Sequence, residues 1–217
     1  MTPPSHAQHH VPSTDPRTFW EDHYERQRER FRGNPNALAT GHLEDLTPGI
    51  ALELGSGQGA DAIWLARRGW TVTALELSET ALRLARERAA AAGVADRIAW
   101  RQHDLTDGLP GGAFDLVLSS YTQSPLPFGR TAVLRAAADR VAPGGALLVV
   151  GHSGIPSGAT GGPPPEDLPD AATLIDALAL PADGWSVDRR EDVAREVTSP
   201  DGEPGTRRDS VVRFRRR

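Results

Sequence analysis

The sequence predicts an α/β protein built around a mostly parallel sheet, and three observations support this prediction. Short apolar runs alternate with helical patterns along most of the chain, as in successive βα units. Three glycines at alternate positions, Gly55, Gly57 and Gly59, follow the first apolar run, where a strand would end and a helix begin. The run 113–119 is apolar almost throughout, which is typical of a parallel strand buried on both faces.

Length and composition favour one domain. The chain has 217 residues, of which 38% are hydrophobic and 24% charged, and this suits a single sizeable α/β domain. We expect a disordered lead over residues 1–15, rich in Pro, His, Ser and Thr, followed by one domain over 16–217. The sequence contains neither a long apolar run nor the pattern of a signal peptide, so we expect a cytoplasmic protein without a membrane span.

Missing residue types exclude several chemistries. The chain has no cysteine, which rules out a thiolate zinc site and a cysteine nucleophile, and we expect no metal site. All 24 basic residues are arginine, so no lysine can form a Schiff base. A net charge of -5 and a pI near 5.8 provide no field that would attract nucleic acid, and a small-molecule substrate is the natural expectation.

Two helices are predicted before the first strand. Over 17–32 the residues Trp20, Tyr24, Gln27 and Phe31 recur on one helical face. This aromatic face would dock the helix onto the rest of the domain. A second, shorter helix is predicted over 36–45, ended by a Pro-Gly pair.

The segment IALELGSGQG over 50–59 predicts a buried strand, a tight glycine turn and the start of a helix running to about residue 68. Glycines allow positive φ angles and a close approach of a ligand to the backbone. Glu53 stands two residues before Gly55, where a carboxylate would repel a pyrophosphate and suits a cationic ligand. The run from Glu53 to Gly59 resembles the first motif, E/D-x-G-x-G-x-G, of the class I S-adenosylmethionine-dependent methyltransferases.

The next strand, over 70–75, ends at Glu76, which lies 21 residues after Gly55. An acid at this place is suited to accept hydrogen bonds from the ribose hydroxyls of an adenosine. The alternative interpretation of Glu76 is an ordinary surface glutamate at the end of a strand. Ser78 is a good N-cap for a helix over 79–92.

A third strand, over 97–103, ends at Asp104-Leu105. The resemblance implies that Asp104 bonds the adenine amino group and that Leu105 meets the ring, the alternative for Asp104 being a turn cap. The strand 113–119 ends in Ser120-Tyr121-Thr122-Gln123-Ser124-Pro125. Enzymes of this resemblance that methylate adenine or glutamine carry an Asn/Asp-Pro-Pro-Tyr/Phe tetrad here, which this chain lacks.

A helix over 131–140 and a strand over 146–151 follow, with Pro143-Gly144-Gly145 as the turn between them and His152 at the strand's carboxyl end. The Gly/Pro-rich segment 154–170 is either a rim over the substrate or an unstructured insertion. We then expect a helix over 171–180 and strands over 185–190, 193–197 and 209–215, the last two forming a hairpin.

The resemblance implies a Rossmann-like, doubly wound sheet of seven mostly parallel strands with an antiparallel terminal hairpin. Residues 16–46 would form a helical lid over a sheet core at 47–217. The closest analogy is to the small bacterial enzymes similar to tellurite-resistance and thiopurine methyltransferases. The expected function is methyl transfer from S-adenosylmethionine to a small molecule, with S-adenosylhomocysteine as product. The alternatives are an NAD-dependent oxidoreductase and a catalytically inactive cofactor-binding module.

The site residues follow from these assignments. The expected cofactor-binding set, at the ends of the strands, is Glu53, Gly55, Ser56, Gly57, Gly59, Glu76, Leu77, Asp104, Leu105 and Ser120. The expected substrate-side set is Trp20, Tyr24, Tyr121, Gln123 and His152. His152 and Tyr121 are the candidates for a general base, which is required only when the acceptor atom carries a proton. For each of these two residues, the alternative is a role in packing alone. The sequence does not indicate the oligomeric state.

Overall fold

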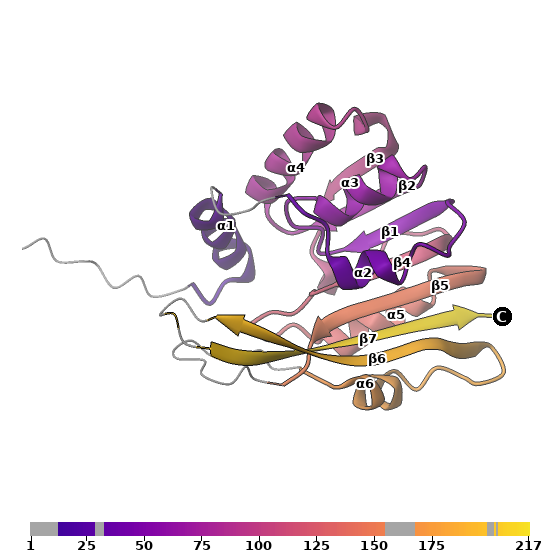
Figure 1. The fold of residues 1–217 in the computed structure, drawn as a ribbon. Helices are drawn as coiled ribbons and strands as arrows, with labels where there is room; N and C mark the ends of the chain where they lie inside the picture. The colour runs from indigo at the N-terminus through magenta and orange to yellow at the C-terminus, as the bar shows by residue number, and fades with distance from the viewer. Residues whose placement is uncertain (1–12, 29–32, 155–167, 199–201, 203) are drawn as a thin grey trace, which may run out of the picture.

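The structure is a computed structural model that describes residues 13–28, 33–154, 168–198, 202 and 204–217. Its centre is a seven-stranded sheet with the order β3-β2-β1-β4-β5-β7-β6 (Figure 1). The strands are β1 (Ile50–Leu54), β2 (Thr71–Glu76), β3 (Ile98–Gln102), β4 (Phe114–Ser120), β5 (Val141–His152), β6 (Trp185–Thr198) and β7 (Pro204–Arg216). The first five pair in parallel, whereas β7 runs antiparallel to both β5 and β6. The predicted fold class is therefore confirmed.

Helices cover both faces of this sheet (Figure 1). They are α1 (Pro16–Gln27), α2 (Ala37–Gly41), α3 (Ala60–Arg67), α4 (Glu79–Ala91), α5 (Arg130–Ala138) and α6 (Ala171–Leu178). Single 3-10 turns lie at Ala95–Arg97 and Leu105–Asp107. Side-chain caps explain several starts, since Asp15, Asn36, Ser78 and Asp170 each accept a backbone N–H from the first turn of the helix that follows.

The core has two halves, one on each face of the sheet, because successive strand residues point to opposite faces. On β5, Ala146, Leu148 and Val150 pack in one half with α2 and α3, whereas Leu147 and Val149 pack in the other with α5 and α6. Helices thus pack against both faces of the sheet, which is the arrangement called doubly wound.

Two segments differ from the sequence expectation. The strands expected at 185–190 and 193–197 are one strand, β6, in which an irregularity between Val187 and Arg189 shifts the register without ending the pairing to β7. The Pro-Gly turn at 143–145 is part of β5, which begins at Val141; its register to β4 shifts between Phe114 and Leu116. The remaining helices and strands start and stop within a few residues of their predicted ends.

Several expectations lie outside the described residues. They are the disordered lead through residue 12, Phe31, most of the Gly/Pro-rich segment 154–170, and the hairpin turn apart from Gly202.

A buried arginine links the terminal hairpin to the connection before β1. The side chain of Arg213 on β7 is 1% exposed and pairs with Asp45 and Asp188. Its guanidinium donates to both carboxylate oxygens of Asp45, at 2.5 and 2.8 Å, to Asp188 at 3.0 Å and to the backbone oxygen of His42 at 2.6 Å. The hydrogen bonds from Arg213 lower the pKa of Asp45 to about 2.

We predict that Arg213→Ala destabilises the protein by about 3 kcal/mol, because it leaves two carboxylates and a carbonyl without their buried donor. Urea unfolding followed by circular dichroism measures this free energy. Arg101→Ala, on the exposed face of β3, is the control and is expected to change stability by less than about 0.5 kcal/mol. Equal effects of the two substitutions would contradict the structural role of Arg213.

Candidate functional site

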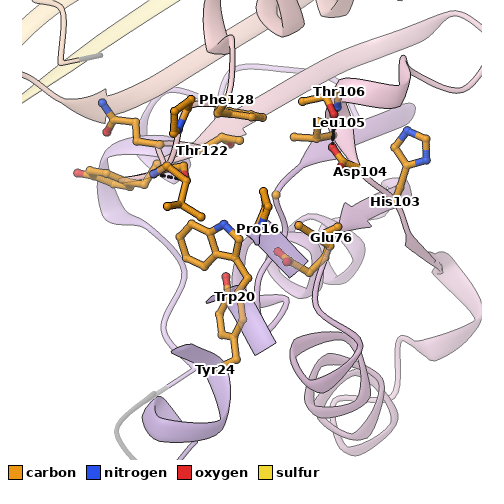
Figure 2. Close-up of a pocket in the computed structure, with 17 residues that line it drawn as sticks. Pro16, Trp20, Tyr24, Glu76, His103, Asp104, Leu105, Thr106, Thr122 and Phe128 are labelled. Atoms are coloured by element: carbon orange, nitrogen blue, oxygen red, sulfur yellow. Dashed lines mark hydrogen bonds between the residues drawn. The ribbon is translucent and has the colours of Figure 1, made fainter. Parts of the chain in front are cut away.

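A cavity of about 200 Å³ lies at the carboxyl edge of the parallel strands, beneath α1 (Figures 1 and 2). Trp20 and Tyr24 reach into it from α1, with Glu76 and Asp104 on one side and Thr122 on the other. Ligands of open α/β sheets bind at this edge, where strands end and helices begin. The cavity is lined by Pro16, Trp20, Tyr24, Gly55, Glu76, Leu77, His103, Asp104, Leu105, Thr106, Tyr121, Thr122, Gln123, Ser124, Leu126, Pro127 and Phe128.

All three glycines of the loop between β1 and α3 have positive φ angles, +64° at Gly55, +52° at Gly57 and +82° at Gly59. The side chains nearest to the three glycines differ. A Cβ on Gly57 would come within 2.9 Å of the Tyr24 hydroxyl, and one on Gly55 within 3.1 Å of the Thr122 methyl. The first two glycines therefore form a floor that only side chains of other segments cover.

Gly59 has a different role, since the side chains next to it belong to the core. A Cβ there would lie 2.4 Å from the Trp100 ring and 2.9 Å from the Ala85 methyl. Glycine is required at this position to seat α3 against α4 and β3, whereas the sequence analysis placed Gly59 in the cofactor-binding set.

Glu76 holds the glycine loop to the start of α4. Its carboxylate oxygens accept the backbone N–H groups of Gly57 at 2.8 Å and Ser78 at 2.9 Å. The side chain also lines the cavity. The backbone N–H of Leu77 also contributes a hydrogen bond to Glu76. A carboxylate has about four acceptor positions, so Glu76 can still accept from a ligand.

Glu53, Asp61 and Glu76 bring three acidic side chains together beneath the loop. Burial raises the pKa of all three, and Asp61 and Glu76 further raise that of Glu53. Glu53 is 2% exposed; it accepts the backbone N–H of Ala62, while its Oε2 atom has no hydrogen-bond partner among the described residues. Buried acids without a cation are costly. The cluster is therefore suited to a positively charged group.

Asp61 also connects the loop to neighbouring segments. It accepts the backbone N–H of Asn36 at 2.6 Å, and hydrogen bonds from Asn36 and the Ser120 hydroxyl partly oppose the rise of its pKa. Ser120 thus supports an acid of the cluster. Ser56, another member of the predicted set, is 7% exposed, and its backbone N–H donates to Leu75.

The end of β3 forms the far wall of the cavity. Asp104 accepts hydrogen bonds from the backbone and hydroxyl of Thr106, at 2.9 and 2.7 Å (Figure 2). It therefore caps a turn, which was its alternative role, and still faces the cavity together with Leu105 and Leu77. The leucines provide an apolar surface beside a carboxylate.

Glu21 fastens α1 to α4. Its carboxylate accepts the Ser78 hydroxyl at 2.8 Å and the backbone N–H groups of Glu79 at 2.7 Å and Thr80 at 3.1 Å. A carboxylate at a helix N-terminus is favourable because free N–H groups and the helix dipole meet there. This contact holds Trp20 and Tyr24 over the cavity.

The opposite side of the cavity is formed after β4. Tyr121 adopts φ +51°, a strained conformation for a residue with a side chain. Its ring lies 4.4 Å from that of His152. Gln123 donates to the His152 carbonyl at 3.0 Å and accepts the His152 N–H at 2.7 Å. His152 contacts both of these residues but is not among those that line the cavity.

Most of the predicted residues thus meet at one edge, though in three groups. Trp20, Tyr24, Gly55, Glu76, Leu77, Asp104, Leu105, Tyr121 and Gln123 line the cavity. Glu53, Ser56, Gly57, Gly59 and Ser120 lie beneath or beside it, and His152 lies against the ring of Tyr121. The sequence analysis missed Glu21, Asp61, Thr122 and Asp209, the last of which bonds His152 at 2.8 Å.

Within the described ranges, no helix is both long enough and apolar enough to cross a bilayer. The same part of the chain contains no group of three or more His, Cys, Asp or Glu side chains arranged to hold a metal ion.

Comparisons with known proteins agree with this geometry. Residues 51–145 match a protein family described as a methyltransferase domain. A release factor glutamine methyltransferase of Rhodopirellula baltica is 36% identical over 83 residues, which are 37% of this chain and 28% of that protein. The chain therefore spans less than a third of the length of this relative.

Two solved structures show the same fold. TehB from Haemophilus influenzae has a TM-score of 0.71 and 16% identity, covering 91% of this chain and 67% of TehB. The glycopeptide N-methyltransferase MtfA, solved in complex with S-adenosylmethionine, has a TM-score of 0.58 and 19% identity, covering 82% of this chain and 91% of MtfA. Residues 51–145 therefore match a methyltransferase domain, and the strand order and the glycine loop agree with this match.

Proposed function

We propose that the protein is a cytoplasmic enzyme that transfers the methyl group of S-adenosylmethionine to a small-molecule acceptor and releases S-adenosylhomocysteine. One observation carries the proposal. The floor of the site contains the buried, partly unpartnered carboxyl of Glu53 beside Asp61 and Glu76. A cationic ligand over the glycine loop would compensate these acids, whereas the pyrophosphate of a dinucleotide would be repelled by them.

The residues present fit this cofactor. Glu53 would face its positively charged methionyl portion, and Gly55 and Gly57 would lie beneath it. Glu76, already held by two backbone N–H groups, would accept from the ribose hydroxyls. Asp104, Leu105 and Leu77 would surround the adenine. When bound, the cofactor supplies a methyl group activated by a sulfonium, so the protein's task is chiefly to orient two reactants and exclude water.

The acceptor side favours a small molecule. The cavity lies under the aromatic residues of α1, and its wall is completed by Tyr121, Gln123 and Phe128, so an acceptor would be enclosed rather than laid on a surface. The net charge of -5 does not favour nucleic acid as the acceptor.

The α1 helix would act as a lid. Ligand sites usually enclose roughly 300 to 1,000 Å³, more than the 200 Å³ beneath Trp20 and Tyr24. Admitting both reactants would require α1 to move outward, and the hydrogen bonds from Ser78, Glu79 and Thr80 to Glu21 are the contacts that this movement would break.

Calorimetric titration with S-adenosylhomocysteine, and separately with NAD, tests the cofactor. We expect micromolar binding of the homocysteine compound alone. Binding of NAD alone would replace the proposal with an oxidoreductase, and binding of neither would favour an inactive module.

We predict that Glu53→Gln makes the ligand-free protein more stable while it weakens binding of S-adenosylhomocysteine about 10- to 150-fold. The pKa of Glu53 is raised in the folded state, so the stability that its protonated form contributes is lost as the pH rises through that pKa. At pH 7.5 the variant should therefore be more stable than the wild type. The gain should shrink towards pH 5.

Thermal unfolding across this pH range and calorimetry at pH 7.5 measure both effects. Glu87→Gln, at an exposed ion pair on α4, is the control and should leave stability and affinity nearly unchanged. A Glu53→Gln protein that is less stable than the wild type, or that binds equally well, would refute the charge argument.

Substitutions of the glycines should separate binding from folding. Gly57→Ala should reduce affinity at least about tenfold with a stability loss near 1 kcal/mol, because the three atoms nearest to the added Cβ all belong to Tyr24 of α1. Gly59→Ala should cost about 2 to 4 kcal/mol of stability, because it combines φ +82° with overlap of the Trp100 ring.

Gly93→Ala is the matched control, since Gly93 has φ +70° and no atom within 4 Å of the added Cβ. Urea unfolding and calorimetry of the three variants distinguish the roles. If Gly57→Ala binds normally, the loop does not contact the cofactor as proposed.

A further inference from the structure

His152 lies in a cluster of polar side chains that the cofactor site does not use. The cluster brings together the ends of β4 and β5 with the last part of β6 and the first part of β7, which lie at the same end of the sheet as α1 (Figure 1). Its members are Tyr121, His152, Asp209, Arg195 and Arg207.

The hairpin supplies a fixed carboxylate. Asp209 pairs with His152 in the sheet, and its side chain is fully buried. One oxygen lies 2.8 Å from His152 Nδ1, and the other accepts from Arg195 Nε at 2.6 Å. Burial would raise the pKa of Asp209, but the hydrogen bonds from Arg195 and His152 outweigh this effect and lower it. Asp209 is therefore a carboxylate and accepts the Nδ1 proton.

This arrangement determines the state of the imidazole. A neutral imidazole whose Nδ1 donates a proton has a lone pair on Nε2. Burial lowers the pKa of His152, the bond to Asp209 opposes this effect, and Arg207 and Arg195 lower the pKa further. The side chain is 28% exposed. Nε2 has no hydrogen-bond partner in the described part of the chain, so it is free to accept a proton.

The ring is close to the cavity. The Tyr121 ring, 4.4 Å from the imidazole, lines the cavity. Gln123, which also lines the cavity, donates a hydrogen bond to the carbonyl of His152 and accepts one from its backbone N–H. An acceptor held against Tyr121 and Gln123 would thus have a proton acceptor next to it.

We propose that Asp209 is a positioning residue that holds His152 as a general base, and that the methyl acceptor is a phenol-like hydroxyl. The proposal rests on the methyl-transfer function. In the step it implies, the acceptor proton passes to Nε2, a bond forms between the acceptor oxygen and the methyl carbon, and the electrons of the broken carbon–sulfur bond stay on sulfur. The imidazolium then returns its proton to water.

Charge selects the hydroxyl over other acceptors. Arg195 and Arg207 flank the imidazole on the hairpin, and both influence His152. Asp209 offsets the charge of Arg195, so the cluster keeps the positive charge of Arg207. This charge disfavours an ammonium acceptor and stabilises the negative charge that develops on a hydroxyl oxygen. A thiolate carries no proton and needs no base. Among hydroxyls, a phenol has a pKa near 10, which is within reach of a histidine.

The tautomer is tested by long-range nitrogen–proton NMR of histidine-labelled protein, with His152 assigned from the spectrum of His152→Gln. We expect the proton on Nδ1 at pH 7. In Asp209→Asn we expect a lower His152 pKa and a loss of this preference, because the carboxylate no longer accepts the proton. A wild-type signal with the proton on Nε2 overturns the proposal.

The acceptor class is tested with 4-methylphenol and thiophenol, the second of which is ionised at neutral pH. His152→Gln and Asp209→Asn should each lower methylation of the phenol about 100-fold or more and change methylation of the thiolate less than about threefold. For the phenol, kcat/KM should rise with pH through the His152 pKa and then level off, and this inflection should move to lower pH in Asp209→Asn.

His42→Gln and Asp176→Asn, both outside the cluster, are the matched controls and should leave the two rates unchanged. A phenol rate that His152→Gln does not alter overturns the role of His152. Methylation of thiophenol alone, or of neither probe, by a wild-type protein that binds S-adenosylhomocysteine overturns the phenol assignment. A wild-type protein that does not bind S-adenosylhomocysteine refutes the methyltransferase function itself, whereas the tautomer experiment still tests the Asp209–His152 pair.

Discussion

The carboxylate of Glu76 is the contact on which the site depends. By accepting from Gly57 and Ser78, it joins the turn after β1 to the helix after β2. Ser78 in turn caps α4 and donates to Glu21 of α1. One side chain at the end of a central strand thereby sets the position of the glycine loop, the start of a helix and, through that helix, the covering aromatic residues.

The same edge of the sheet carries an electrostatic cost. Glu53 and Glu76 are almost fully buried, and burial raises the pKa of both. A protein selected for stability alone would have neutral side chains here. Retaining acids makes sense when a cation completes the site, and the fold tolerates them because Leu52, Leu54 and Leu75 anchor the same strands in the core.

The sequence was most informative where short-range rules apply. Strand ends, helix caps and the glycine turn are determined by residues that are close together in the sequence. The predicted strands, and most of the residues predicted at their carboxyl ends, therefore lie where the structure has them. Asp209 and Arg195 escaped prediction because their meeting with His152 depends on the register of β5, β7 and β6, which no local pattern encodes. Glu21 resembled an ordinary surface residue of an amphipathic helix, since its partners lie more than 50 positions away. Gly59 fitted the ligand motif, and nothing in the sequence indicated that Trp100, far along the chain, also requires a glycine there.

The reversed direction of β7 has a consequence for how this enzyme divides its tasks. Because β7 runs against β5, its early residues return to the edge where the parallel strands end, although they belong to the last part of the chain. The residues proposed to hold the cofactor, apart from Ser120, thus come before residue 110, whereas the cluster around His152 is completed by the terminal hairpin. If the proposed roles hold, exchange of the hairpin sequence would alter acceptor chemistry while leaving the loop of Gly55 and Gly57 intact, and the two halves would be separable units for engineering.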